Sequence, residues 1–253
     1  MRFTIEAACC CNMGKIRRNN EDNFYFDGRC LEVQNEGLRH PVEVEEKLKN
    51  GWCAAVFDGM GGENYGEYAS FAAARKMQQM EKSLTDFFIP ERKYLSRMAM
   101  QLNNAVVHAA RELKTERMGS TMVALYFMSG SIYVCNLGDS RAYRLRGGEF
   151  LQISQDHVEQ RPQSERKKAP LTQHLGIDPE YMLIEPYIAK DEVKKGDQYL
   201  LCSDGLTDML TNFEISDIML QADDATSCVT QLMEAALEHG GRDNITAIVC
   251  RIV

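Results

Sequence analysis

The sequence has no apolar run long enough to cross a membrane, and its nine cysteines form neither a Cys-x-x-Cys pair nor a cluster with histidine. An odd number of cysteines cannot all pair, and most of them lie in apolar stretches such as those around Cys135 and Cys250. These absences disfavour a membrane span, a disulfide-stapled fold and a thiolate zinc site, and they favour buried, reduced thiols in a cytoplasmic protein. Glu6 also stands too near the start for a secretory signal.

Basic charge is scarce as well, because 29 lysines and arginines face 37 aspartates and glutamates. The resulting net charge of −8 argues against nucleic acid or an anionic membrane as the main partner. The 253 residues are enough for one large core, and no repeat, low-complexity segment or linker divides them. We therefore predict a single domain over residues 1–253.

Hydrophobic periodicity predicts the order of the secondary structure. Strands are expected over residues 3–11, 24–26, 52–58, 121–128, 131–137, 141–145, 150–153, 182–188, 198–202 and 245–253, and helices over 65–84, 95–113, 214–221 and 225–239. The polar segment 34–50 is expected to be a surface excursion that could include a short helix. Strands joined by short turns, with helices segregated in pairs, indicate an α+β fold of two stacked antiparallel sheets, each covered by a helix pair.

The chain is organised around the stretch from Ala54 to Gly62, where a buried strand ends in Asp58 followed by three glycines. Three interpretations compete. One is a tight turn closed by the aspartate, and another is a dinucleotide fingerprint, although its third glycine would fall on Asn64. The last is a site for a hard metal ion, held by carboxylates and by the exposed carbonyl of Gly59.

Further acidic residues stand at the boundaries of predicted elements, beside small or polar residues. They occur in Asn20-Glu21-Asp22, Gly138-Asp139-Ser140-Arg141, Ser203-Asp204-Gly205 and Gly241-Arg242-Asp243-Asn244. Any one of these is a turn or helix cap by default. Carboxylates collected at one end of a sandwich repel each other unless cations neutralise them, and an all-oxygen ligand set suits Mg²⁺ or Mn²⁺ rather than zinc. None of the histidines has metal-ligand spacing, and loop capping is the better explanation for His157.

Taken together, these motifs resemble the protein phosphatase 2C family of metal-dependent phosphatases, in its compact bacterial form. The resemblance runs through Gly14-x-x-Arg17-x-x-Asn20-Glu21-Asp22, Asp58-Gly59-Met60-Gly61-Gly62, Gly119-Ser120-Thr121, Gly138-Asp139-Ser140-Arg141, Asp156-His157, Leu175-Gly176, Leu201-Cys202-Ser203-Asp204-Gly205-Leu206 and Asp243-Asn244-Ile245-Thr246. It implies a four-layer αββα sandwich, which agrees with the layers inferred from the element order.

The resemblance also implies a site with two metal ions, Mn²⁺ or Mg²⁺. Asp58 would bridge both ions. Asp204 and Asp243 would complete one of them, and Glu21 with the carbonyl of Gly59 would complete the other.

Three further roles follow from the resemblance. Asp22 would orient metal-bound water, Arg17 would grip the substrate phosphate, and Asp139 with Asp204 would hold a weaker third ion. A hydroxide shared by two ions about 3.5–4 Å apart would attack phosphorus in line, without a phosphoenzyme. The implied activity is hydrolysis of phosphoserine and phosphothreonine in proteins, opposing a cognate Ser/Thr kinase, by a cytoplasmic monomer.

Two departures from the family pattern matter. Some relatives carry a histidine where this chain has Met60, and that histidine is proposed to protonate the leaving alkoxide, which a thioether cannot do. The segment between His157 and Leu175 is also shorter than expected for the flap beside the family's active site. Two rival functions stay open, namely a pseudophosphatase that binds phosphoproteins without cleaving them and a hydrolase of small phosphate esters.

Overall fold

The computed structural model describes residues 3–48, 51–61, 65–81, 90–128, 130–160 and 169–253. In chain order the elements are β1 (Thr4–Asn12), β2 (Asp22–Phe26), β3 (Val42–Lys47), β4 (Trp52–Met60), α1 (Gly66–Glu81), α2 (Glu91–Glu112), β5 (Gly119–Ser120), β6 (Met122–Met128), β7 (Ser131–Leu137), β8 (Arg141–Arg146), β9 (Glu149–Gln152), β10 (Tyr187–Glu192), β11 (Gln198–Cys202), α3 (Asp204–Thr207), α4 (Asn212–Gln221), α5 (Ala225–Glu238) and β12 (Ile245–Ile252). Gly62, Asn64, the end of the predicted first helix at residues 82–84 and part of the predicted flap, residues 161–168, lie outside the described residues.

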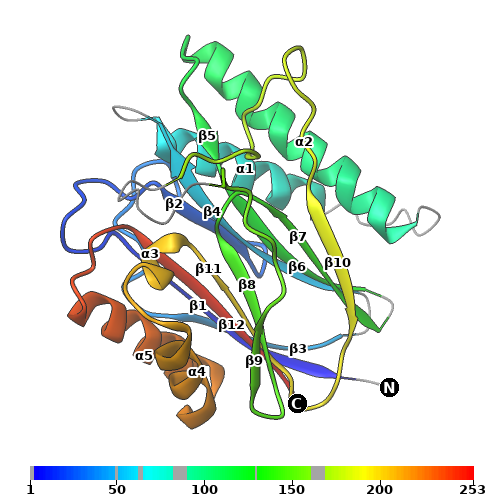
Figure 1. Ribbon diagram of the computed structural model, residues 1–253, viewed down its shortest axis with the longest axis vertical. Coiled ribbons are helices and arrows are strands. Elements are labelled where there is room, and N and C mark those ends of the chain that lie inside the picture. Colours follow the sequence, from blue (N-terminus) through cyan, green and yellow to red (C-terminus); the bar gives the residue numbers. More distant parts are fainter. Residues whose placement is uncertain (1–2, 49–50, 62–64, 82–89, 129, 161–168) are drawn as a thin grey trace.

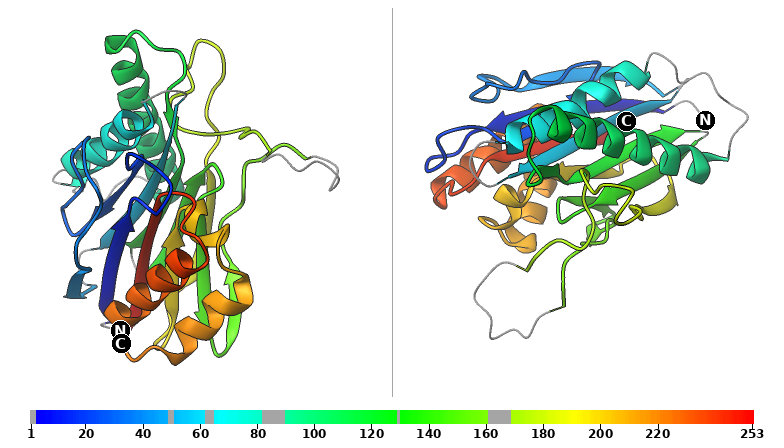
Figure 2. Two further views of the ribbon diagram at one scale, coloured as in Figure 1. Left: turned by 90° about the vertical axis from the view of Figure 1, so that its left-hand side faces the viewer. Right: turned by 90° about the horizontal axis from the view of Figure 1, so that it is seen from above.

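Two antiparallel sheets stack face to face (Figure 1). One has the strand order β3-β1-β12-β11-β8-β9, and the other has the order β10-β7-β6-β4-β2, with β5 attached to β4. Helices α1 and α2 cover the outer face of the second sheet, and α4 and α5 cover the outer face of the first, as Figure 2 shows. The predicted α+β sandwich of four αββα layers is confirmed.

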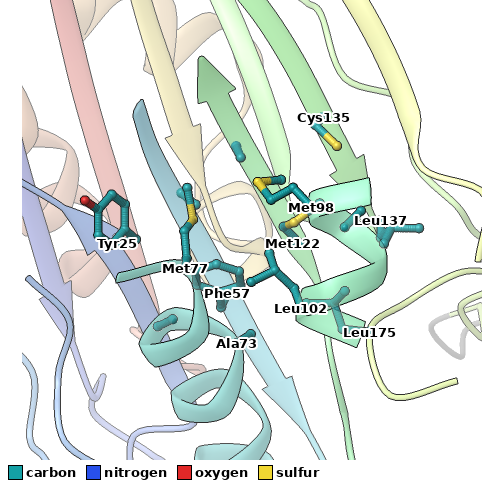
Figure 3. Packing of buried hydrophobic residues seen from close by; sticks show 14 of the residues in the cluster. Tyr25, Phe57, Ala73, Met77, Met98, Leu102, Met122, Cys135, Leu137 and Leu175 are labelled. Atoms are coloured by element: carbon teal, nitrogen blue, oxygen red, sulfur yellow. The ribbon is translucent and has the colours of Figure 1, made fainter. Parts of the chain in front are cut away.

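Strand β4 shows how the layers determine the direction of each side chain. Ala54 and Val56 pack between the two sheets, whereas Ala55 and Phe57 face the helices. Figure 3 shows Phe57 among the side chains that α1, α2 and the sheet contribute to that outer core. Because side chains alternate along a strand, Asp58 continues the row of Val56 and faces the opposite sheet.

Two segments differ from the sequence prediction. The polar segment 34–50, expected to be a surface excursion, contains edge strand β3, which pairs with β1 and places Val42 and Val44 against the inter-sheet core. The strand predicted over 182–188 starts only at Tyr187, because the chain turns back through the hydrogen bond from Met182 N to Asp178 O. Pro186, just before β10, has no N–H to donate to a ladder.

The cysteines and the lengths of the helices bear on the disulfide-stapled fold and the membrane span that the sequence disfavours. All nine cysteines are free, and eight of them are buried; burial raises the pKa of Cys10 and of Cys135 to about 12. The expected burial is therefore confirmed for eight of the nine cysteines. None of the helices within the described ranges combines the length and apolar character that a bilayer crossing requires.

The two chain ends meet at one end of the first sheet, where Thr4 and Val253 exchange backbone hydrogen bonds (Figure 2). Near them, Arg146 Nε and Nη2 each donate to the carboxylate of Asp197 at 2.7 Å, and Tyr199 Oη adds a third bond at 2.9 Å. Burial alone would raise the pKa of Asp197, but these donors outweigh it and the pKa is lowered. Such a carboxylate stabilises the fold above its unfolded pKa, and the stabilisation disappears as the pH falls through its folded pKa.

We predict that Asp197→Asn lowers the free energy of unfolding by about 1.5–3 kcal/mol at pH 7, because charge-assisted hydrogen bonds to a buried group are lost. The difference from the wild type should shrink as the pH falls below about 4, since protonation then removes the same charge from the wild type. Denaturant titrations at pH 7 and below pH 4 measure both effects. Asp217→Asn, on the exposed surface of α4, is the matched control and should change neither. Equal unfolding free energies of Asp197→Asn and the wild type at pH 7 would contradict this role.

Candidate metal centre

The predicted acidic residues lie at the end of the sandwich opposite the chain termini. There, Asp22 connects the two sheets. Asp22 begins β2 directly opposite Asp58 of β4, so the register of one strand pair places both carboxylates on one face. Across the gap, Ser203 Oγ and Thr246 Oγ1 of the first sheet each donate to Asp22 Oδ2 at 2.7 Å. Because Ser203 immediately precedes Asp204, this clamp also holds Asp204 at the same end.

A second hydroxyl pair ties Asp58 to the turn that carries Asp139. The backbone N–H of Asp58 donates to Thr121 Oγ1 at 3.0 Å, and Thr121 Oγ1 lies 2.7 Å from Ser140 Oγ in a further hydrogen bond. Ser140 follows Asp139 directly and leads into β8 of the first sheet. The predicted bridging residue and the predicted third-ion residue are thus attached to one buried network.

Asn244 connects the remaining two acidic segments. Its Oδ1 accepts from the backbone N–H of Glu21 at 2.8 Å, and its Nδ2 donates to the carbonyl oxygens of Met13 and Asn19 at 2.8 and 3.0 Å. Asn244 therefore fixes the loop before Glu21 against the start of β12, beside Asp243. All five acidic segments singled out from the sequence converge on one end of the sandwich.

The sequence prediction missed the uncharged residues that produce this convergence. They are Thr121, Ser140, Ser203, Asn244 and Thr246. The sequence did give one indication of these residues, because each stands within three residues of an acid or inside one of the quoted motifs. Nothing in a single sequence states which carboxylate or amide a given hydroxyl will reach across two sheets.

Glycines allow Glu21 to lie against the end of β4. A Cβ on Gly59 would stand 2.1 Å from the carbonyl oxygen of Gly66 and 2.5 Å from that of Glu21. A Cβ on Gly66 would stand 2.7 Å from Glu21 Cδ. The Gly59 N–H also donates to the Glu21 carbonyl at 3.0 Å. Any larger side chain would separate the Glu21 carboxylate from the Gly59 backbone, the pair predicted to share one ion.

Burial and neighbouring carboxylates raise the pKa of Glu21 and of Asp22 at this end. Burial raises the pKa of Glu21, and the neighbouring charges of Glu67 and Asp243 raise it further. Burial also raises the pKa of Asp22 to about 7, and Asp243 and Glu21 contribute in the same direction. Such mutual repulsion is the electrostatic environment that a bound cation relieves.

Arg17 lies at the rim of the carboxylate group. Its Nη2 donates to Asp243 Oδ2 at 2.6 Å, and the two side chains are 46% and 31% exposed. Burial would lower the pKa of Arg17, but the Asp243 carboxylate reverses the effect and raises it. The cationic group predicted to grip phosphate therefore stands beside a predicted metal ligand, within reach of solvent.

In the turn that carries Asp139, the nearby Arg141 forms its ion pair with a different aspartate. Arg141 would be the natural ion-pair partner of Asp139, but Arg141 instead forks onto Asp156, with Nη2 to Oδ2 at 2.7 Å and Nε to Oδ2 at 3.0 Å. His157 caps the same turn as predicted, since its backbone N–H donates to the Gly138 carbonyl at 3.0 Å and its Nδ1 accepts from the Gly138 N–H.

Whether a metal fits can be judged from the donors present. Within the described ranges, no three His, Cys, Asp or Glu side chains stand close enough together to hold an ion as they are now arranged. The donors gathered here are nevertheless carboxylate and carbonyl oxygens, without thiolate or imidazole, and they repel one another. This donor set is that of a hard divalent cation such as Mg²⁺ or Mn²⁺. The individual ligand assignments stay predictions.

Comparisons with known proteins show to which family the chain is related. The family model described as protein phosphatase 2C matches residues 44–249. The serine/threonine protein phosphatase PstP of Mycobacterium tuberculosis is 31% identical over 252 residues; the match covers 95% of this chain but only 43% of PstP. The serine/threonine phosphatase stp of Listeria welshimeri is 27% identical, over 93% of this chain and 91% of stp.

Solved structures agree with the fold. The catalytic domain of PstP in complex with two manganese ions superposes with a TM-score of 0.79 at 28% identity, over 99% of both chains. PppA, described as a regulatory component of a secretion system in Pseudomonas aeruginosa, gives a TM-score of 0.73 at 26% identity over the whole of both chains. Since the family model covers most of the sequence and the fold agrees throughout, the chain belongs to the protein phosphatase 2C family.

Proposed function

We propose that this chain is a metal-dependent protein-serine/threonine phosphatase, which hydrolyses phosphoserine and phosphothreonine in proteins. The observation that carries the proposal is the convergence of five acidic segments, from both sheets, on one hydrogen-bonded end of the sandwich. Curated relatives named as serine/threonine phosphatases support the same activity. The PstP structure with two manganese ions supports the choice of cofactor.

The proposed ligands divide into two sets that share Asp58. Asp204 and Asp243 would complete one ion, and Glu21 with the carbonyl of Gly59 would complete the other. Mn²⁺ or Mg²⁺ held there would supply water activation and charge neutralisation at the phosphate.

The protein's own groups position the substrate and the water. The Arg17 guanidinium, at the solvent-facing rim, presents a planar fork that matches two phosphate oxygens. Asp22 cannot rotate away, because Ser203 and Thr246 both hold its Oδ2, and its Oδ1 would orient the attacking water. Rigid placement of this kind lowers the entropic part of the barrier.

The cellular setting that we propose follows from the substrate. A phosphoprotein substrate requires a Ser/Thr kinase, which would be the cognate partner. We propose a cytoplasmic monomer with one catalytic domain over residues 1–253. Its net charge of −8 gives no attraction to nucleic acid or to an anionic membrane.

The proposed function makes three predictions, of which the first concerns metal dependence. The purified protein should hydrolyse a phosphoserine peptide only with Mn²⁺ or Mg²⁺, and a chelator should abolish turnover. Asp58→Asn should lower kcat by several orders of magnitude, because both ions would depend on that carboxylate. Asp217→Asn is the control and should keep wild-type kcat. Full activity after exhaustive chelation would refute metal dependence, whereas peptide binding without any turnover would indicate a pseudophosphatase.

The second prediction concerns Arg17. Arg17→Ala should lower kcat/KM for the phosphopeptide by roughly 10- to 100-fold, mainly through a higher KM, because a charge-assisted fork to the phosphate is lost. Mn²⁺ affinity, measured by calorimetry, should change much less. The neighbouring Arg18→Ala is the matched control, since Arg18 is exposed. A larger loss from Arg18→Ala than from Arg17→Ala would show that the motif register is wrong.

The third prediction concerns Asp139, which we propose holds a third, weaker ion with Asp204. Asp139→Ala should lower kcat sharply at millimolar metal while the melting temperature stays nearly unchanged. A residue that only shapes the turn would behave in the opposite way, with a loss of about 1 kcal/mol in stability and normal turnover below the melting transition. Phosphopeptide kinetics and calorimetry on this one variant separate the two outcomes.

A further inference from the structure

A histidine ring lies beside the end of β4, next to the candidate metal centre. Gly119 of β5 is paired with Met60 of β4. A Cβ on Gly119 would stand 2.8 Å from His174 Nδ1 and 3.1 Å from His174 Cε1. The imidazole therefore occupies the space where a side chain of residue 119 would be.

The alternation of side chains shows which face of the sheet this is. Met60 lies two residues after Asp58 and so shares its face, and Gly119 opposes Met60, so its missing side chain would point the same way. Thr121, two residues after Gly119, confirms the direction, because its hydroxyl bonds Ser140 at the edge of the opposite sheet. The His174 ring therefore lies on the face that carries Asp58.

The separation suits a group that acts on the substrate rather than on the metal ligands. One strand spacing of about 5 Å separates Gly119 from Met60, and two residues along a strand, about 7 Å, separate Met60 from Asp58. A phosphate ester held near Asp58 with its ester oxygen toward β5 would have that oxygen between the carboxylates and the imidazole.

Backbone hydrogen bonds hold the chain beside His174, and a hydrogen bond of the ring itself determines its tautomer. Leu175 and Ser120 exchange two backbone hydrogen bonds of 2.8 and 3.0 Å, which anchor the chain next to His174. His174 Nδ1 lies 2.8 Å from the carbonyl oxygen of Leu175. Since a carbonyl only accepts, this bond places the proton on Nδ1 and leaves Nε2 as the nitrogen that can gain and release one. The residue is half-buried, so it lies at the border between the fold and solvent.

Met60 and His157, two residues of the quoted motifs, are less suited to deliver a proton. The thioether of Met60 carries no acidic proton. His157 uses Nδ1 to accept the Gly138 N–H, and burial lowers its pKa, so it holds a second proton less readily.

We propose that His174 protonates the leaving seryl or threonyl oxygen, an assignment that depends on the phosphatase function proposed above. As the water oxygen forms its bond to phosphorus, the bond from phosphorus to the ester oxygen breaks, and that oxygen takes the proton from Nε2. The proton lost by the attacking water returns to the imidazole through solvent. The products are the free hydroxyl side chain and inorganic phosphate, and the protons balance.

The test uses leaving groups of different acidity. In the Mn²⁺-loaded protein, His174→Gln should lower kcat for a phosphoserine peptide by about 100-fold, within the range for loss of general acid catalysis. The same variant should hydrolyse p-nitrophenyl phosphate at nearly the wild-type rate, because p-nitrophenolate departs without a proton. His108→Gln, on the exposed side of α2, is the matched control and should be normal with both substrates.

Two further measurements distinguish chemistry from structure. His174→Gln should retain wild-type Mn²⁺ affinity and melting temperature, and adding Met60→His, on the same face, should restore part of the peptide activity. Equal losses with both substrates, unchanged peptide turnover or weakened Mn²⁺ binding would each overturn the assignment while leaving the phosphatase function intact. A wild-type protein that cleaves neither substrate would instead refute the phosphatase function itself.

Discussion

The arrangement of the candidate site depends on one buried carboxylate that is hydrogen-bonded across two sheets. Asp22 belongs to the second sheet, and both hydroxyls that hold it, from Ser203 and Thr246, belong to the first. Its register opposite Asp58 and the position of Ser203 before Asp204 then bring three predicted site residues together. The Thr121–Ser140 and Asn244–Glu21 hydrogen bonds connect the acidic edges of the two sheets as well, but Asp22 is the carboxylate that accepts from both hydroxyls at once.

The two ends of the sandwich treat a buried carboxylate in opposite ways. At the end where the termini meet, Asp197 has the guanidinium of Arg146, and its pKa is lowered. At the other end Asp22 has only neutral donors and acidic neighbours, and its pKa is raised. The Arg146 guanidinium offsets the cost of burying the Asp197 charge, whereas the like charges at the other end repel one another unless a cation binds. The carboxylate that contributes to stability, Asp197, and the carboxylates proposed to bind metal thus lie at opposite ends of the strands.

Sequence periodicity predicted the core well because apolar alternation reports burial directly. It identified β4, both helix pairs and the element boundaries at which acidic residues such as Asp58 and Asp204 stand. It misjudged β3, because Glu43, Glu45 and Glu46 gave this edge strand the composition of a loop. It also placed the β10 strand about five residues early, since apolar residues such as Leu183 are exposed there.

Contacts between distant segments could not be predicted in the same way. The sequence does not state that Arg141 would choose Asp156 over Asp139, because the choice depends on how two turns pack. Nor does it indicate that the ring of His174 would fill the space above Gly119, since 55 residues separate them in the chain. Such pairings arise from sheet register, which is a property of the whole fold.

The central claim is that the converging carboxylates hold two divalent cations that share Asp58. A crystal structure of the protein grown with Mn²⁺, with anomalous data collected at the manganese edge, tests it most directly. We expect two anomalous peaks about 3.5–4 Å apart, both within bonding distance of Asp58. The claim would be contradicted if manganese bound elsewhere on the protein, or if a single ion sat at this end without contacting Asp58.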